Sequence, residues 1–83
     1  MQVKKRDGRL EDFDREKIIQ SVMAAGLMEE EAESLASEVE VWVGEVAEEG
    51  VVSTLKIRDK VLELLRGRDP ESATRFEEYK KEY

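Results

Sequence analysis

A long apolar stripe in the middle of the chain most constrains what this sequence can fold into. From Met28 to Val46, apolar residues recur at spacings of three and four, which is the period of an amphipathic helix. The stripe consists of Met28, Ala32, Leu35, Ala36, Val39, Trp42, Val43 and Val46. We therefore predict a helix over about residues 29–48, ended by Gly50, with this stripe facing the core.

Three shorter helices are predicted from the residues that start and stop helices. We expect them over about residues 15–25, 54–66 and 70–82. Asp14 is a favoured N-cap for the first of these helices, and Gly26 ends it. Ser53 or Thr54 caps the second, and Pro70 stands in the first turn of the third, where proline is best tolerated.

An Asp-Gly pair near the N-terminus predicts a β-hairpin. Asp7-Gly8 suits a two-residue type I′ turn, in which both central residues have a positive φ. That turn places Arg6 opposite Arg9, a repulsive pair, and Lys4 opposite Glu11, an attractive one. The repulsion indicates that something negative lies nearby.

The expected fold class is α+β and mostly helical. A hairpin over about residues 2–13 would pack on a bundle of three to four helices, and Val51-Val52 would form a short extended link between two of them. The 83 residues are enough for one domain, which we place over residues 1–83.

The N-terminal residues also differ in charge from the rest of the chain. Residues 1–9 hold four basic side chains and one acidic one, a net of +3, so the other 74 residues carry −10 of the total of −7. This reversal favours an anion site, although a basic edge strand that prevents aggregation is the alternative. Lys17 points the same way, because a cation in the first turn of a helix is disfavoured unless an anion lies close by.

Composition excludes several classes of function. The chain has no Cys and no His, which removes disulfides, thiolate nucleophiles and imidazole chemistry, and we expect no enzyme. A net charge of −7 argues against nucleic acid as a partner. With no apolar run long enough for a bilayer and no signal-peptide pattern, we expect a cytoplasmic protein. A charged fraction of 42% without Asn is typical of thermophilic sources.

The stretch VKKRDGRLEDFDREKI, residues 3–18, resembles the opening of the ATP-cone family. That opening has a hydrophobic residue, then K-R-D-G, an acidic residue three positions beyond the glycine, F-D, and a basic helix start. The segments VSTLKIRDKVLELL and RDPESATRFEEY resemble the family's third and closing helices. The likeness therefore spans essentially the whole chain, and the K-R-D-G hairpin is its most specific part.

The resemblance implies which residues hold the phosphates of a nucleotide. Lys5 and Arg6 would bind them directly, and Lys17 would add positive charge. In the closing helix, Lys80 or Lys81 replaces a phosphate-contacting lysine of the family, and the sequence leaves open which one.

The resemblance also implies the nucleoside side of the site. Glu11 would form a hydrogen bond with the nucleoside, and Val3 and Ile18 would be apolar neighbours of the adenine. Thr54 and Arg58, one turn apart on the predicted third helix, would close over the ligand from the other side.

ATP-cones are regulatory nucleotide-binding domains, known best at the start of ribonucleotide reductases. The resemblance thus implies a non-catalytic module that binds ATP or dATP, with any Mg²⁺ carried by the phosphates. It would act on a separate protein partner or on its own oligomeric state. The alternative is a protein-interaction module that keeps the fold and has lost the nucleotide.

Overall fold

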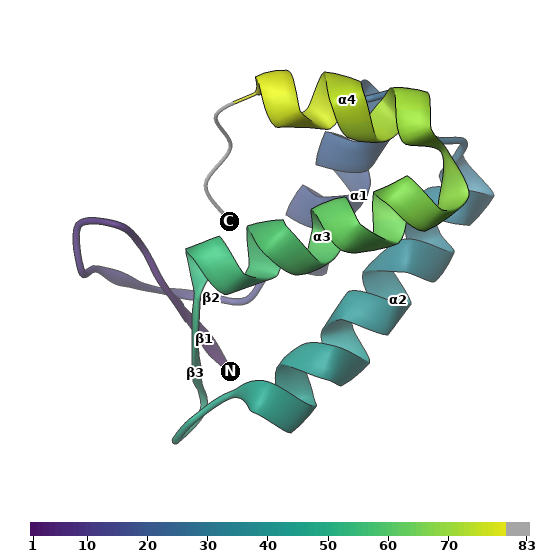
Figure 1. Cartoon of the computed structure of the whole chain (residues 1–83). Helices are drawn as coiled ribbons and strands as arrows, with labels where there is room; N and C mark the ends of the chain where they lie inside the picture. Colours follow the sequence, from purple (N-terminus) through teal and green to yellow (C-terminus); the bar gives the residue numbers. More distant parts are fainter. Residues whose placement is uncertain (80–83) are drawn as a thin grey trace.

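A small sheet and a set of helices make up residues 1–79, the part of the chain that the computed structural model describes. The elements follow in the order β1 (Gln2–Lys4), β2 (Leu10–Asp12), α1 (Arg15–Ala24), α2 (Glu29–Val46), β3 (Val51–Ser53), α3 (Thr54–Arg68) and α4 (Pro70–Glu78). Figure 1 shows β1 and β2 projecting beside the start of α3, while α4 folds back over α3. The predicted class, α+β and mostly helical with an N-terminal hairpin, is confirmed.

The sheet has three strands in the order β2-β1-β3. β1 is antiparallel to β2 and parallel to β3, which places Lys4 beside Ser53. The segment expected to be only an extended link, Val51-Val52, is therefore part of a strand that pairs with β1 at the N-terminus. Its Val52 is 3% exposed and Val3 of β1 is 2% exposed, so this small sheet contributes to the core.

The predicted hairpin register is wrong by one residue. The backbone N–H of Lys5 donates to the carbonyl of Arg9 over 2.8 Å, and the N–H of Gly8 donates to the carbonyl of Lys5 over 3.0 Å. The loop therefore has three residues, and its one positive φ is the 91° of Gly8. A type I′ turn would require a positive φ at Asp7 as well as at Gly8. The three-residue loop is favoured because only Gly8 has to adopt one.

The predicted cross-strand pairs change with the register. Lys4 lies opposite Leu10, and Glu11 lies opposite Val3. The expected facing pairs of Arg6 with Arg9 and of Lys4 with Glu11 do not form, because Arg6 lies in the loop. The repulsion that favoured an anion site is therefore not present in the folded hairpin.

A two-residue turn with two positive φ values occurs instead between α2 and β3. Glu49 has a φ of 53° and Gly50 a φ of 76°, and Glu48 and Val51 exchange two backbone hydrogen bonds of 3.0 Å each. This turn ends α2 at Val46, two residues before the predicted end, and directs the chain into β3.

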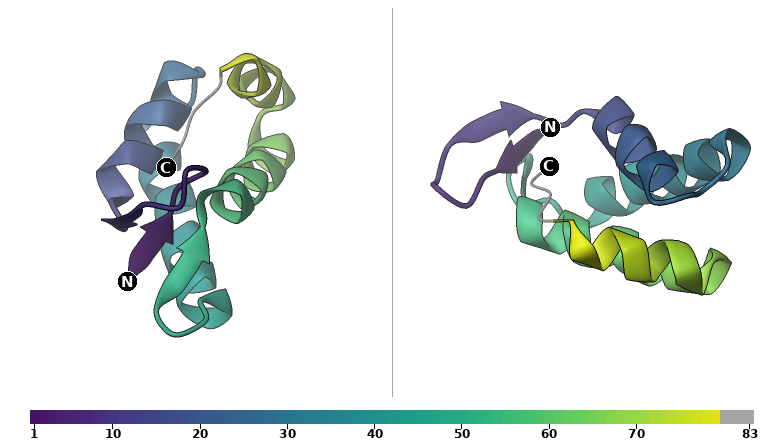
Figure 2. Two further views of the ribbon diagram at one scale, coloured as in Figure 1. Left: turned by 90° about the vertical axis from the view of Figure 1, so that its left-hand side faces the viewer. Right: turned by 90° about the horizontal axis from the view of Figure 1, so that it is seen from above.

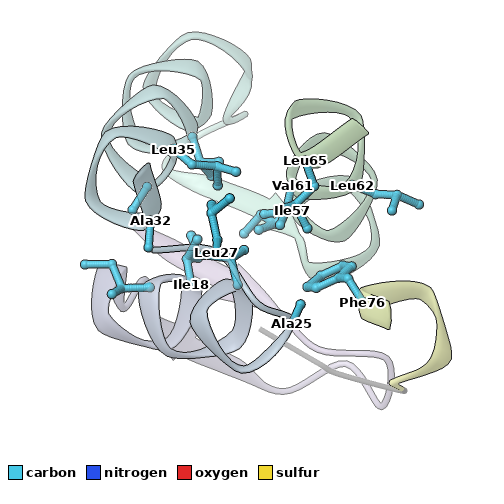
Figure 3. Packing of buried hydrophobic residues seen from close by; sticks show 14 of the residues in the cluster. Ile18, Ala25, Leu27, Ala32, Leu35, Ile57, Val61, Leu62, Leu65 and Phe76 are labelled. Atoms are coloured by element: carbon cyan, nitrogen blue, oxygen red, sulfur yellow. The ribbon is translucent and has the colours of Figure 1, made fainter. Parts of the chain in front are cut away.

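The helices form two pairs, α1 with α2 and α3 with α4, which Figure 2 shows on opposite sides of the molecule. Their apolar faces meet in one cluster, and Figure 3 shows Leu27, Ile57 and Phe76 among the side chains that fill it. The core is built from Val3, Ile18, Ile19, Val22, Ala25, Leu27, Ala32, Leu35, Ala36, Val39, Val43, Val52, Ile57, Val61, Leu62, Leu65, Ala73 and Phe76.

Several predicted helix features need correction. Met28 precedes α2 and is 77% exposed, so it does not belong to the buried stripe. α3 continues through Gly67 to Arg68, two residues beyond its predicted end. The final helix ends at Glu78, because Tyr79 is extended; residues 80–82 of its predicted span, with Lys80 and Lys81, lie outside the described residues. In residues 1–79, no helix has both the length and the apolar character to cross a bilayer.

Candidate functional site

Lys5 is the most unusual charged residue at the N-terminal end of the molecule. It directly follows β1, and its side chain is only 5% exposed. Lysines are rarely buried to this degree, because removing an ammonium group from water is costly unless an opposite charge accompanies it. The Nζ of Lys5 lies 3.9 Å from a carboxylate oxygen of Glu11 on β2.

Glu11 is shared between three cations. Besides Lys5, the Nζ of Lys17 on α1 lies 3.6 Å from its carboxylate, and the Nη2 of Arg9 lies 4.0 Å away. These separations exceed hydrogen-bonding distance, so the carboxylate holds its partners loosely. Three cations, Lys5, Arg9 and Lys17, thus converge on Glu11 from different parts of the chain, and Arg9 is also paired with Asp7.

The hairpin loop is held by the side chain of Asp7. The backbone N–H of Arg9 donates to its carboxylate over 3.0 Å, and the Nε of Arg9 donates over 2.7 Å. The hydrogen bond from the Arg9 backbone, with the guanidinium beside it, lowers the pKa of Asp7 below its usual value. Arg6, at the exposed loop, is presented to solvent by this turn.

The N-terminus of α3 begins beside the end of β1. Since Lys4 pairs with Ser53 in the parallel ladder, the next residues, Lys5 and Thr54, leave the sheet side by side. Ser53 rather than Thr54 caps α3, because its hydroxyl accepts from the N–H of Leu55 over 3.2 Å. Thr54 is 2% exposed, and the first turn of α3 contains no acidic residue. The positive end of a helix dipole therefore lies next to a buried ammonium group.

Arg58, one turn further along α3, is half-buried and links this helix to α4. Its guanidinium lies 5.6 Å from the centre of the Phe76 ring, and its Nη2 donates long bonds of 3.4 Å to the carbonyls of Glu77 and Tyr79. Its Nε is buried and has no hydrogen-bond partner among residues 1–79. Arg58 is therefore incompletely hydrogen-bonded among residues 1–79, and a buried donor without an acceptor is destabilising.

The sequence model of the ATP cone domain family matches residues 1–83, the whole chain. The chain belongs to the ATP-cone family. Its members are nucleotide-binding regulatory domains, and no catalytic family appears in the comparisons. The chain is also 46% identical over 39 residues to an uncharacterized protein of Archaeoglobus fulgidus, an alignment that covers 47% of this chain and 83% of that protein. No solved structure matches the chain.

In this ATP-cone domain, the structure brings some of the predicted site residues together. Lys5, Glu11 and Lys17 are joined by ion pairs, although Lys5 follows β1, Glu11 lies on β2 and Lys17 lies on α1. Thr54 lies beside the end of β1, and Arg58 follows it on α3. Within residues 1–79, no three acidic side chains are grouped to hold a metal ion.

Other predicted residues are placed differently. Val3 and Ile18 are 2% and 0% exposed, so both lie in the core beneath this end of the sheet. Arg9 joins the ion-pair cluster, although the sequence did not predict it as a site residue. The sequence signal for Arg9 is its position two residues after Asp7. An aspartate side chain in a turn often accepts a hydrogen bond from the backbone N–H two residues further on, as Asp7 does from Arg9.

Proposed function

We propose that this domain binds ATP or dATP at the end of β1 and is a non-catalytic regulatory module. The observation that carries the proposal is the buried ammonium group of Lys5, which shares Glu11 with Lys17 and Arg9 and adjoins the start of α3. A triphosphate carries several negative charges, which suits a place where Lys5, Arg9 and Lys17 converge.

The proposed roles follow from where each side chain lies. Lys5 would hold a phosphate at the base of the site, Arg6 would reach it from the loop, and Lys17 would add charge from α1. Glu11 would be freed from its loose ion pairs and would accept a hydrogen bond from the nucleoside. Any Mg²⁺ would arrive with the phosphates rather than in a protein cage.

The other side of the site is formed by α3 and the core. Thr54 and Arg58 would close over the ligand from α3, and the unsatisfied Nε of Arg58 would find an acceptor there. Val3 and Ile18 would support the apolar surface against which adenine lies. Because an effector acts only by binding one state more tightly than another, the nucleotide would favour one oligomeric state or one complex with a partner protein.

A mononucleotide, rather than nucleic acid, suits the charge of the chain. The total is −7, and every charged residue of α2 is a glutamate, so this helix would repel a long polyanion. We place this function in the cytoplasm.

Isothermal titration calorimetry with ATP, dATP, GTP and inorganic triphosphate tests the proposal. We expect saturable binding of an adenine nucleotide that is tighter than that of GTP or triphosphate. The double variant Lys5→Met/Arg6→Ala removes two charges at the site, and we expect it to weaken binding at least about tenfold. The matched control Lys4→Met/Arg66→Ala removes the same charge from exposed positions elsewhere and should bind as the parent does.

Each other outcome has a definite meaning. Equal affinity in the site variant and the control would show that the nucleotide binds away from Lys5 and Arg6. Absence of heat with every ligand at two temperatures would favour a protein-interaction module that has kept the fold and lost the nucleotide. Circular dichroism of both variants establishes that their helices are intact.

A further inference from the structure

A groove lies between α2 and α3, apart from the N-terminal hairpin. Its volume is about 540 Å³, and it is lined by the face of α2 that runs from Ser34 to Glu45 and by Lys60 and Leu64 of α3. This face differs from the one that packs in the core, where Leu35, Ala36, Val39 and Val43 are fully buried. α2 therefore presents a second surface that the other described residues, 1–79, leave open.

The floor of the groove is apolar. Trp42 and Leu64 are half-buried against the core, and Val41 leaves 64% of its surface exposed. The Nζ of Lys60 lies 5.7 Å from the centre of the Trp42 ring and 2.9 Å from Glu63. A second hollow of about 340 Å³ begins on the other side of Trp42 and Lys60, so the surface continues along α3. Trp42 stands at the junction of the two hollows.

One end of the groove is closed by ion pairs. Arg68, at the end of α3, contacts Glu31 and Glu38 of α2 and donates a bond of 3.3 Å to Ser34. Figure 1 shows the two helices closest at this end and diverging toward β3. The groove is thus open toward the C-terminal half of α2.

The rim at the open end is negative. Every charged residue of α2 is a glutamate, and its last turn has no basic residue to offset the negative end of the helix dipole. Arg68 neutralises glutamates only at the closed end, and Lys60, which also lines the groove, is paired with Glu63. Glu45, beside the exposed Val41, is left without such a pairing to Arg68 or Lys60. An apolar floor with a negative rim is complementary to a segment that is apolar on one face and basic on the other.

We propose that this groove binds an amphipathic helix of a partner protein, with an apolar stripe set on Trp42 and Val41 and with Lys or Arg facing Glu45. A helix suits the site because two diverging helices form a trough for its apolar face. A second copy of the chain fits less well, because its α2 carries only negative charge and the apolar face of its basic α3 is already buried in its own core. This proposal rests on the proposed function, because a regulatory module needs a partner protein on which to act. The experiment that tests it uses no nucleotide.

The single tryptophan of the chain is a reporter placed in the groove. The probe is a synthetic peptide of about five helical turns, without tryptophan, that has Leu at i, i+3, i+4 and i+7 and Lys elsewhere. A peptide of the same composition with its leucines out of register is the reference. We expect a saturable blue shift of Trp42 emission with the amphipathic peptide, and at least tenfold weaker binding of the reference.

Two variants and one matched control locate the binding. Val41→Ser and Glu45→Lys should each weaken binding several-fold, because the first removes exposed apolar surface and the second reverses a rim charge. Glu40→Lys makes the same charge change on an exposed position of α2 that does not line the groove, and it should have a smaller effect. All three positions are exposed, so the fold should survive each change.

Four results would overturn the proposal. Equal affinity for the two peptides would reduce the interaction to general charge attraction. An effect of Glu40→Lys as large as that of Glu45→Lys would remove the assignment to the groove. A Trp42 shift that depends on protein concentration without peptide would make the groove a contact between copies. No saturation up to about 1 mM peptide would exclude a helix-binding site. The peptide titration contains no nucleotide. Its outcome is therefore independent of whether the domain binds ATP or dATP.

Discussion

At the scale of single residues, Gly26 tolerates a side chain least well. Its φ is 115°, and a Cβ there would lie 2.7 Å from the Nη2 of Arg75 and 3.2 Å from the Oγ of Ser72. Arg75 cannot simply move away, because its Nε donates to the carbonyl of Ala25 over 2.7 Å and so ties α4 to the end of α1. The loop after α1 is therefore fixed by a residue without a side chain.

Gly26→Ala should lower the free energy of unfolding by about 1–3 kcal/mol, the range for a residue held in a sparsely populated backbone conformation. Gly44→Ala is the matched control. Gly44 lies within α2 without a positive φ, and no neighbouring atom of residues 1–79 would come within 4 Å of an added methyl group. The same change there should therefore stabilise the protein by about 0.5–1 kcal/mol. Urea unfolding measures both. If Gly26→Ala also stabilised the protein, the contact with Arg75 would not restrain this loop.

Residues of the candidate site were only partly predictable from the sequence. Lys5, Glu11 and Lys17 were each predicted, and the structure places them together. The burial of Lys5 was not predicted, because lysines are mostly exposed and the residues next to it in the sequence are charged. Arg9 was not predicted as a site residue, because the predicted register placed it opposite Arg6 instead of opposite Lys5.

At the scale of elements, the caps determine where helices begin. Asp69 caps α4, since its carboxylate accepts from the N–H of Glu71 over 3.2 Å and from the hydroxyl of Ser72 over 2.8 Å. The hydrogen bond from Ser72, aided by backbone N–H groups, lowers the pKa of Asp69 below its usual value. Its contribution to stability is thus fully present above the unfolded-state pKa of about 4 and is lost as the pH falls through the folded-state value.

Asp69→Ala should lower the midpoint of thermal unfolding at pH 7 by several degrees, because it removes both acceptors from the start of α4. Asp69→Asn keeps an acceptor and should lose less. The difference between the parent and Asp69→Asn should shrink as the pH is lowered from 7 to about 2, because only the parent loses a charge at this position. Asp59→Asn, an exposed change on α3, controls for the loss of one negative charge. A difference that stayed constant with pH would contradict an ionised cap.

The elements themselves were predictable to different degrees. The helix starts at Asp14 and Pro70 were predicted from adjacent residues, because the signals that start a helix are local. β3 was not predicted as a strand, since its partner β1 lies far from it in the sequence, at the N-terminus, and three residues alone carry little pattern. The turn type was wrong at Asp7-Gly8 because two turns of different length fit the same letters, and hydrogen bonds to Asp7 decide between them.

At the scale of the whole molecule, the important surfaces are formed by segments far apart in the sequence. Arg68 joins α3 to Glu31 and Glu38 of α2, and this pairing sets the closed end of the groove. The stripe containing Trp42 was predicted to face the core, yet Trp42 is only partly buried and also lines the groove. Periodicity identifies an apolar face but does not show how completely the neighbouring helix covers it.

The proposed nucleotide site has the same non-local character, which makes nucleotide binding a test of the whole fold. Its residues come from β1, β2, α1 and α3, so an unfolded chain cannot assemble them and a ligand would bind the folded state alone. A ligand at one hundred times its dissociation constant should then stabilise the domain by about 2.7 kcal/mol. For a domain of this size, that corresponds to a rise in the unfolding midpoint of roughly 10–20 °C.

Differential scanning fluorimetry is unsuitable where dyes bind apolar grooves, so the midpoint should be followed by circular dichroism. We expect the rise with ATP or dATP in the parent and in Lys4→Met/Arg66→Ala, and a much smaller one in Lys5→Met/Arg6→Ala. An equal rise with GTP and inorganic triphosphate would show that the site recognises phosphates alone. Because the groove between α2 and α3 contains none of these residues, Glu45→Lys should leave the nucleotide-induced rise intact, which separates the two surfaces within one domain.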